Sequence, residues 1–177
     1  MAEEFQDLEL TENKDQISYD EVQLLISERL YQLKGHLFKY DSEADKNLLV
    51  AQDVFFCADR MEGSKRHQYI IHVTDQAQKI SYTRMVIEKD PPLNYTFSES
   101  DKILMWIGKP TGLEVPAWSF LIESRDDVVR MKGVLTKMIF ETNHMEDIEK
   151  ACERDDEAYL EAQVLGDGDN ELMEGTS

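Results

Sequence analysis

Ala117-Trp-Ser-Phe-Leu-Ile122 is followed, after one residue, by Ser124-Arg-Asp-Asp-Val-Val-Arg-Met-Lys-Gly-Val-Leu-Thr-Lys-Met-Ile-Phe-Glu-Thr142. The first stretch is a short apolar and aromatic run that is typical of a strand. Ser124 can cap a helix, and Asp126 and Asp127 would favour its positive end. We therefore predict a last strand followed directly by one helix that packs across an open end of the sheet. Its apolar stripe, at helical spacing, comprises Val128, Met131, Leu135, Met138, Ile139 and Thr142. The methionines on this stripe are predicted to fill the core.

Six further apolar and aromatic runs precede this helix, and turn-forming clusters separate them. The clusters include Asp41-Ser-Glu-Ala-Asp45, Asp59 to Lys65 and Asp90-Pro-Pro92, where proline cannot donate to a sheet ladder. Connections this short indicate antiparallel neighbours. We predict a mainly β (α+β) fold, a seven-stranded antiparallel sandwich or barrel capped by a C-terminal helix, with strands near 35–40, 48–57, 67–73, 79–87, 93–97, 103–107 and 117–122.

The stretch before the first strand has the features of a helix start. Ser18-Tyr-Asp-Glu21 can form a capping box, in which the serine and the glutamate satisfy free backbone amides. Apolar residues then follow at helical spacing, namely Val22, Leu25, Ile26, Leu30 and Leu33. We predict an amphipathic N-terminal helix over about 18–31 that leads into the first strand.

Negative charge is concentrated at the two ends of the chain. Of the formal net charge of −18, residues 1–21 supply −7 (eight acids, one base) and residues 143–177 supply −10 (twelve acids, two bases). The middle, 22–142, is almost neutral, with 17 acids and 16 bases. This balance argues against binding nucleic acid or an anionic membrane, because phosphate recognition needs a cationic surface. A basic protein partner stays open, as does the alternative that the acidic tails only maintain solubility.

These patterns divide the chain into four segments. Residues 1–17 are predicted to be an acidic disordered segment, and 18–142 a folded domain that includes the N-terminal helix. Residues 143–165 are predicted to be an acidic helical extension, with Ile148, Tyr159 and Leu160 as docking points. Residues 166–177 have the composition of a disordered acidic tail.

Residues that could carry chemistry do not form a recognisable catalytic or metal-binding pattern. His67 and His72 are five residues apart in a predicted strand, so they should point to opposite faces. Cys57 lies in an apolar strand and far from Cys152, which gives neither a disulfide framework nor a metal pattern. Ser119 lacks the neighbouring glycines of a nucleophile elbow. We predict that the protein is not an enzyme and uses no cofactor or metal.

Four residues are candidates for contact with a protein partner. Trp106 and Trp118 lie in the last two strands, where tryptophan is either a core residue or an exposed anchor. Lys132 and Lys137 lie on the predicted final helix, although the basic residues as a whole do not form a dense patch. We keep all four as predicted partner-binding residues.

The order of about seven antiparallel strands and one helix resembles the pleckstrin-homology-like (PH-like) superfold over residues 30–142. Leu37-Phe-Lys-Tyr-Asp41 is similar to the opening of the Ran-binding domains and of the PH-like module of the vacuolar import and degradation 27 family. In that family an aromatic-rich strand and a long final helix lead into an acidic segment. The matching stretches here are His67–Val73, Met131–Thr142 and Glu153–Leu160.

The chain departs from both families at particular places. Ran-binding domains carry Trp-Lys-Glu-Arg-Gly after the first strand, whereas this chain has Lys46-Asn-Leu-Leu-Val50. The strand that commonly contains tryptophan in the vacuolar import and degradation 27 family offers Tyr69. That family's β-propeller has no counterpart here, which leaves open whether the chain is a fragment of a longer protein.

The resemblance implies a non-catalytic adaptor that binds other proteins. A Ran-type small-GTPase-binding domain and an acidic-tailed chaperone of histones or other basic proteins are the alternatives. Lipid-binding members of the superfold carry basic residues in the first hairpin, so Asp41–Asp45 argues against phosphoinositide binding. Residues 1–16 lack the apolar run of a signal peptide, and no stretch approaches the length of a membrane span. We expect the protein in the cytoplasm, with the nucleus as the alternative.

Overall fold

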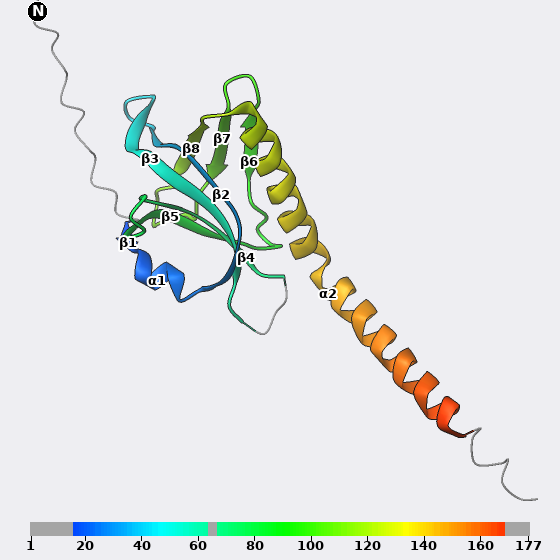
Figure 1. Cartoon of the computed structure of the whole chain (residues 1–177). Coiled ribbons are helices and arrows are strands. Elements are labelled where there is room, and N and C mark those ends of the chain that lie inside the picture. Colours follow the sequence, from blue (N-terminus) through cyan, green and yellow to red (C-terminus); the bar gives the residue numbers. More distant parts are fainter. Residues whose placement is uncertain (1–15, 64–66, 169–177) are drawn as a thin grey trace, which may run out of the picture. The chain divides into compact units, whose positions relative to one another are not determined.

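The computed structural model describes residues 16–63 and 67–168. The chain divides into two compact units, Met1–Asn143 and His144–Ser177, which are described separately. Figure 1 shows the strands and helices in the order β1 (Ile17–Ser18), α1 (Tyr19–Gln23), β2 (Ile26–Asp41), β3 (Lys46–Met61), β4 (Tyr69–Thr74), β5 (Ile80–Ile87), β6 (Tyr95–Ser98), β7 (Ile103–Ile107), β8 (Ala117–Ile122) and α2 (Arg125–Gly168).

The strands of the first unit form one antiparallel sheet in the order β1-β5-β4-β3-β2-β8-β7-β6. The long strand β2 links its two halves, because it pairs with β3 over Ile26–Asp41 and with β8 over Gly35–Lys39. The prediction of a mainly β fold with antiparallel strands and a C-terminal helix is confirmed. The sequence predicted seven strands, and the described part of the chain adds an eighth, the two-residue β1.

Gly35 lies where β2 meets both neighbours, and the space there admits no side chain. A Cβ at this position would lie 2.2 Å from the carbonyl oxygen of Leu121 and 2.6 Å from Cε1 of Phe120. Both atoms belong to β8, which pairs with β2 at this point. Glycine therefore allows β8 to approach β2 closely enough to join the two halves of the sheet.

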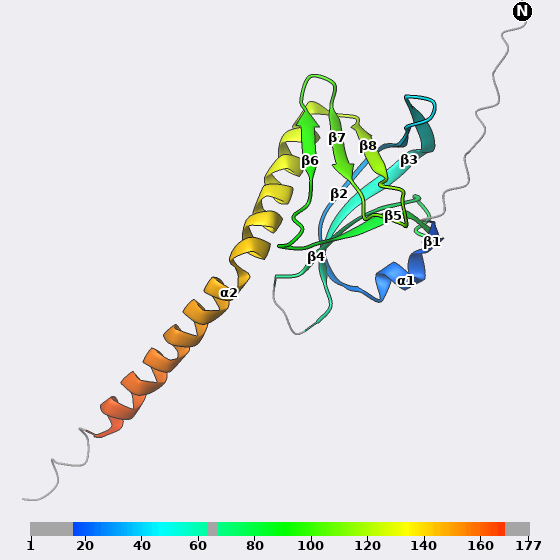
Figure 2. The same ribbon diagram turned by 180° about the vertical axis from the view of Figure 1, so that it is seen from behind.

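The two faces of the sheet are covered by different helices. Tyr69, Ile71 and Val73 alternate along β4 and face the main core, which contains the buried residues of α2. Ile70, on the opposite face of β4, packs with Tyr19 and Val22 of the α1 segment. Figures 1 and 2, which show the molecule from opposite sides, place α1 away from the first turns of α2.

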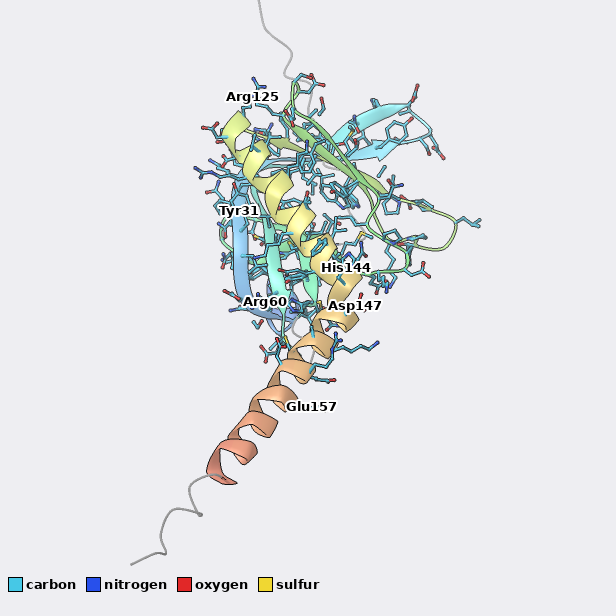
Figure 3. All side chains as sticks on the ribbon, turned by 90° about the vertical axis from the view of Figure 1, so that its right-hand side faces the viewer. Tyr31, Arg60, Arg125, His144, Asp147 and Glu157 are labelled. Atoms are coloured by element: carbon cyan, nitrogen blue, oxygen red, sulfur yellow. The ribbon has the colours of Figure 1, made fainter. Side chains whose placement is uncertain are left out.

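The start of α2 closes the main core as the sequence predicts. The amide of Asp127 donates to Oγ of Ser124 at 3.1 Å, which confirms Ser124 as the cap. Tyr31 of β2 lies beside the first turns of α2 (Figure 3), and its hydroxyl donates to Oδ1 of Asp127 at 3.1 Å. The predicted stripe is buried except for the half-buried Ile139, and it places Met131 and Met138 in the core as expected.

The predicted N-terminal helix is wrong in its length. Ser18 does cap a helix, but α1 ends at Gln23 and β2 begins at Ile26. Residues from Ile26 onward pair with β3, starting with Ile26 opposite Met61. Cross-strand pairing over a long ladder therefore overrides the helical spacing of Leu30 and Leu33, since local periodicity is weaker than tertiary context.

The predicted loop at 59–65 begins later than expected, and its residues 64 and 65 lie outside the described residues. β3 continues to Met61, so Asp59 and Arg60 are strand residues that pair with Ile70 and Tyr69 of β4. β4 begins at Tyr69, so His67 precedes it. Asp59 is fully buried, whereas aspartate side chains are mostly exposed unless they are paired.

The second unit contains the remainder of α2. The sequence indicated a helix to about Thr142 followed by a separate extension over 143–165, whereas the structure has one helix from Arg125 to Gly168. Residues 166–168 therefore belong to this helix rather than to the predicted tail. The rest of that tail and residues 1–15 of the predicted disordered segment 1–17 lie outside the described residues. Ile17, which was assigned to the same segment, instead belongs to β1 and pairs with Ser81 of β5.

Candidate protein-binding surface

The two tryptophans lie together in the main core. Trp106 of β7 is directly opposite Trp118 of β8, and their stacked rings are 6.5 Å apart. Their side chains are 3% and 1% exposed. Trp106 thus offers little surface to a partner, while Trp118 also contributes to the lining of a groove described below.

Lys132 and Lys137 lie on the exposed side of α2. Nζ of Lys132 is 3.0 Å from Oε1 of Glu99, and Nζ of Lys137 is 3.9 Å from Oε1 of Glu141. Both pairs are largely exposed on the lysine side, where an ion pair adds little to stability. The structure does not bring these lysines together with the tryptophans, and their predicted role in partner binding stays a prediction.

The first groove lies between the β2–β3 turn and the β7–β8 connection. Its volume is about 580 Å³, and its lining includes Tyr40, Leu48, Leu113 and Val115. Leu113 is fully exposed and Val115 is 56% exposed, so both present apolar surface to solvent. These two side chains contribute nothing to the core, and together with Tyr40 they make the lining of this groove partly apolar.

A second groove is bordered by the two ends of the β7–β8 connection. Its volume is about 700 Å³, and its lining includes Met85 and Val86 of β5 with Pro110, Pro116 and Trp118. β1 pairs with β5 only at Ile80 and Ser81, so the rest of this edge of β5 has no strand partner within the described ranges. The connection between β7 and β8 thus contributes residues to both grooves.

Leu113 and Val115 were not among the residues that the sequence singled out. The available signal was the loop Lys109-Pro-Thr-Gly-Leu-Glu-Val-Pro116, which carries two apolar residues between turn-forming ones. The amide of Thr111 donates a hydrogen bond to the carbonyl oxygen of Glu114 at 2.9 Å, and the amide of Glu114 donates to the carbonyl oxygen of Thr111 at 3.2 Å. These two bonds order the loop between them. This pairing holds Leu113 at the tip of the turn.

A buried polar cluster lies under α1, on the opposite face of the sheet from the main core. Arg29 Nε donates to Oδ1 of Asp59 at 3.0 Å, and Nε2 of His72 lies 2.5 Å from Oδ2 of the same carboxylate. The Arg29 guanidinium also donates to the Tyr19 hydroxyl at 2.8 Å. Asp59 and His72 are fully buried. The cluster therefore joins β2, β3 and β4 to the α1 segment.

Cys57 lies next to this cluster, directly opposite His72 in the β3–β4 ladder. Burial is the largest cause that raises the pKa of its thiol, to about 12, and the nearby Asp59 carboxylate adds to the effect. A catalytic cysteine needs a lowered pKa, so this arrangement does not activate the thiol. Among the described residues, no group of three or more His, Cys, Asp or Glu side chains could hold a metal ion.

We expect one of the two cysteines to be unreactive in the folded protein. At pH 8 Cys57 is buried and protonated, whereas Cys152 is exposed. Folding raises the pKa of the Cys57 thiol, so the folded chain holds this proton more tightly than the unfolded chain does. The resulting stabilisation is complete below the ordinary pKa of a thiol, and it is lost as the pH rises toward 12. Ellman's reagent at pH 8 should titrate one thiol in the native chain and two after denaturation. Reaction of both native thiols would contradict this burial, and the Cys152→Ser variant is the control that should show no native reaction.

Comparison with known proteins supports the fold and identifies no family. Neither the family models nor the curated proteins searched contain a match to this chain. The Ran-binding domain of the nuclear complex component Nup2 from Ashbya gossypii is similar in structure, with a TM-score of 0.51 and 10% identity over 65% of this chain and 97% of that one. Dcp1p is similar with a TM-score of 0.50 and 9% identity, over 67% of this chain and 87% of that one.

These likenesses support a PH-like fold. Sequence identities this low are evidence for the fold alone. They do not test the narrower resemblance to the vacuolar import and degradation 27 family. Within the described residues, no helix has both the length and the apolar character that crossing a membrane requires.

Proposed function

We propose that this chain is a non-catalytic protein-binding module that contacts its partner through the β7–β8 connection. The observation that carries the proposal is the exposed apolar group of Leu113, Val115 and Tyr40 beside the first groove. A few residues near the centre of a contact supply most of its binding energy, and tyrosine is enriched among them. Tyr40 is therefore the expected anchor, and Leu113 and Val115 add apolar surface beside it. The PH-like fold supports this function, because that fold presents loops and grooves on a rigid sheet.

The finer proposal is an adaptor similar to the PH-like module of the vacuolar import and degradation 27 family, acting in the cytoplasm or alternatively in the nucleus. The sequence likeness at Leu37–Asp41 and Glu153–Leu160 supports it. An adaptor needs no cofactor. The acidic first hairpin and the net charge of −18 favour a protein partner over phosphoinositides, membranes or nucleic acid.

Replacing Leu113 and Val115 together with serine should strongly weaken partner binding without unfolding the chain. Both side chains are exposed, so their loss should change the free energy of unfolding by less than about 0.5 kcal/mol. Loss of an apolar anchor should weaken binding by about 2 kcal/mol or more, roughly thirtyfold. Immobilised full-length chain would be used to capture proteins from a cell extract, followed by mass spectrometry.

The matched control for this experiment is Val129→Ser. Val129 is 59% exposed on α2, close to the 56% of Val115, so its replacement removes an equally exposed valine that does not line the groove. Proteins retained by the wild type should be retained by this control and lost with the double variant. Retention of the same proteins by all three chains would refute the proposed contact surface.

Two rival functions are distinguished by the same capture. Retention of a small GTPase in only one nucleotide state would favour a Ran-type module, for which the similarity to a Ran-binding domain is the supporting observation. Retention of histones or other basic proteins that disappears when the acids of 144–168 are replaced by asparagine and glutamine would favour an acidic-tailed chaperone. The net charge of −10 over residues 143–177 is the observation behind this second rival.

A further inference from the structure

The first groove combines an apolar wall with an acidic rim. Its apolar part is formed by Tyr40, Leu48, Leu113 and Val115, which come from β2, β3 and the β7–β8 connection. Three carboxylates share this lining, those of Asp41, Glu43 and Glu114. The nearby Asp45 accepts a hydrogen bond from the Tyr40 hydroxyl at 2.5 Å, which raises the pKa of Tyr40.

The basic side chain in this lining, Lys39, already contacts other residues of the protein. Nζ of Lys39 is 3.0 Å from Oε1 of Glu114 and lies 5.5 Å from the centre of the Trp118 ring. The lining as a whole therefore holds three carboxylates against one ammonium group. Exposed carboxylates at a groove rim attract positive charge and repel phosphate or carboxylate groups.

The acidic rim is ordered by backbone contacts in the β2–β3 turn. Oδ1 of Asp41 accepts hydrogen bonds from the amides of Glu43 and Ala44, at 2.9 and 3.3 Å. This arrangement fixes the turn and holds Glu43 exposed beside the groove. The groove thus presents a fixed pattern of charge next to its apolar wall.

We propose that this groove binds a short segment of a partner protein in which an apolar side chain is flanked by lysine or arginine. The apolar side chain packs against Leu113 and Val115, and the cations lie against Glu43 and Asp41. The volume of about 580 Å³ suits a few side chains rather than a whole domain face. The inference rests on the proposed function and specifies the partner's chemistry.

The test selects binders from a displayed library of random twelve-residue peptides on the full-length wild-type chain. The selected peptides should be enriched in lysine or arginine beside an apolar residue. Their affinity should fall about tenfold or more with Glu43→Lys, and it should also fall as the salt concentration rises from 50 to 500 mM, roughly. The matched control is Glu88→Lys, which reverses an exposed carboxylate in the lining of the second groove and should leave the affinity unchanged.

Each other outcome counts against the inference. Selection of acidic or uncharged peptides, selection of no peptide, or equal binding of basic peptides to wild type and Glu43→Lys would overturn it. If the peptides lose affinity with Glu88→Lys instead, the site is the second groove and the assignment to the first is refuted. None of these results decides the proposed function, which is judged by whether captured proteins are lost with the Leu113 and Val115 double variant.

Discussion

Replacing Gly35 with alanine is expected to destabilise the first unit by about 3 kcal/mol. The new Cβ would lie 2.2 Å from the backbone oxygen of Leu121, and backbone cannot move aside as a flexible side chain can. Relief requires β2 and β8 to separate where they pair, and the aromatic ring of Phe120 blocks the other direction at 2.6 Å. Urea unfolding followed by tryptophan fluorescence measures the loss.

Gly133→Ala is the matched control for this prediction. Gly133 lies on the exposed side of α2, and a Cβ there would have no atom within 4 Å. Alanine is favoured over glycine inside a helix, so this variant should be stabilised by about 0.5–1 kcal/mol. A Gly35→Ala variant within 1 kcal/mol of the wild type, roughly, would show that the two strands do not approach as described.

Removing Arg29 from the buried cluster is expected to cost about 3 kcal/mol. Methionine at this position preserves the length of the apolar stem and removes the guanidinium that contacts both oxygens of Asp59, at 3.0 and 3.3 Å. The Asp59 carboxylate is fully buried, and breaking a buried ion pair leaves an uncompensated charge that costs about 3–5 kcal/mol. Since Arg29 itself is 27% exposed, we expect the lower end of that range.

Lys34→Met provides the comparison within the same strand. Lys34 pairs with Asp53 at 3.4 Å, and both side chains are substantially exposed. An exposed pair contributes about 0–1 kcal/mol, so this variant should unfold almost as the wild type does. Equal losses in the two variants, measured by the same urea titration, would mean that the Arg29 cluster is no more important than a surface contact.

Much of the fold could be predicted from local pattern. The stripe from Val128 to Thr142 repeats at helical spacing, and its cap and acidic first turn agree with it, so the start of α2 and its buried face were identified. The strands between Leu48 and Ile122 were identified for the same reason, since alternating apolar runs and short turns agree with each other.

Residues 26–31 could not be predicted because two signals conflict there. Their apolar spacing fits a helix, yet these residues pair with β3, an interaction that is not local in sequence. Asp59 was placed in a loop for a related reason. The Asp59 carboxylate can be buried because it pairs with Arg29, thirty positions away, and with His72. Residues adjacent to Asp59 in the sequence give no sign of these partners, so it was predicted to lie in a loop.

The candidate site was the least predictable part. Tryptophan is a common contact residue, which directed attention to Trp106 and Trp118, but the pairing of β7 with β8 places both rings in the core. Leu113 and Tyr40 are 73 positions apart in the sequence and border the same groove only because β8 pairs with β2. Such proximity follows from the sheet order and not from any local motif.

The most direct test of the central claim is a titration of isotope-labelled full-length chain with the tightest selected peptide, followed by amide NMR shifts. If the β7–β8 connection is the binding surface, the largest shifts should fall on Tyr40, Glu43, Leu113 and Val115. Shifts centred on β6 and α2, or spread evenly over the sheet, would contradict a binding surface at the β7–β8 connection.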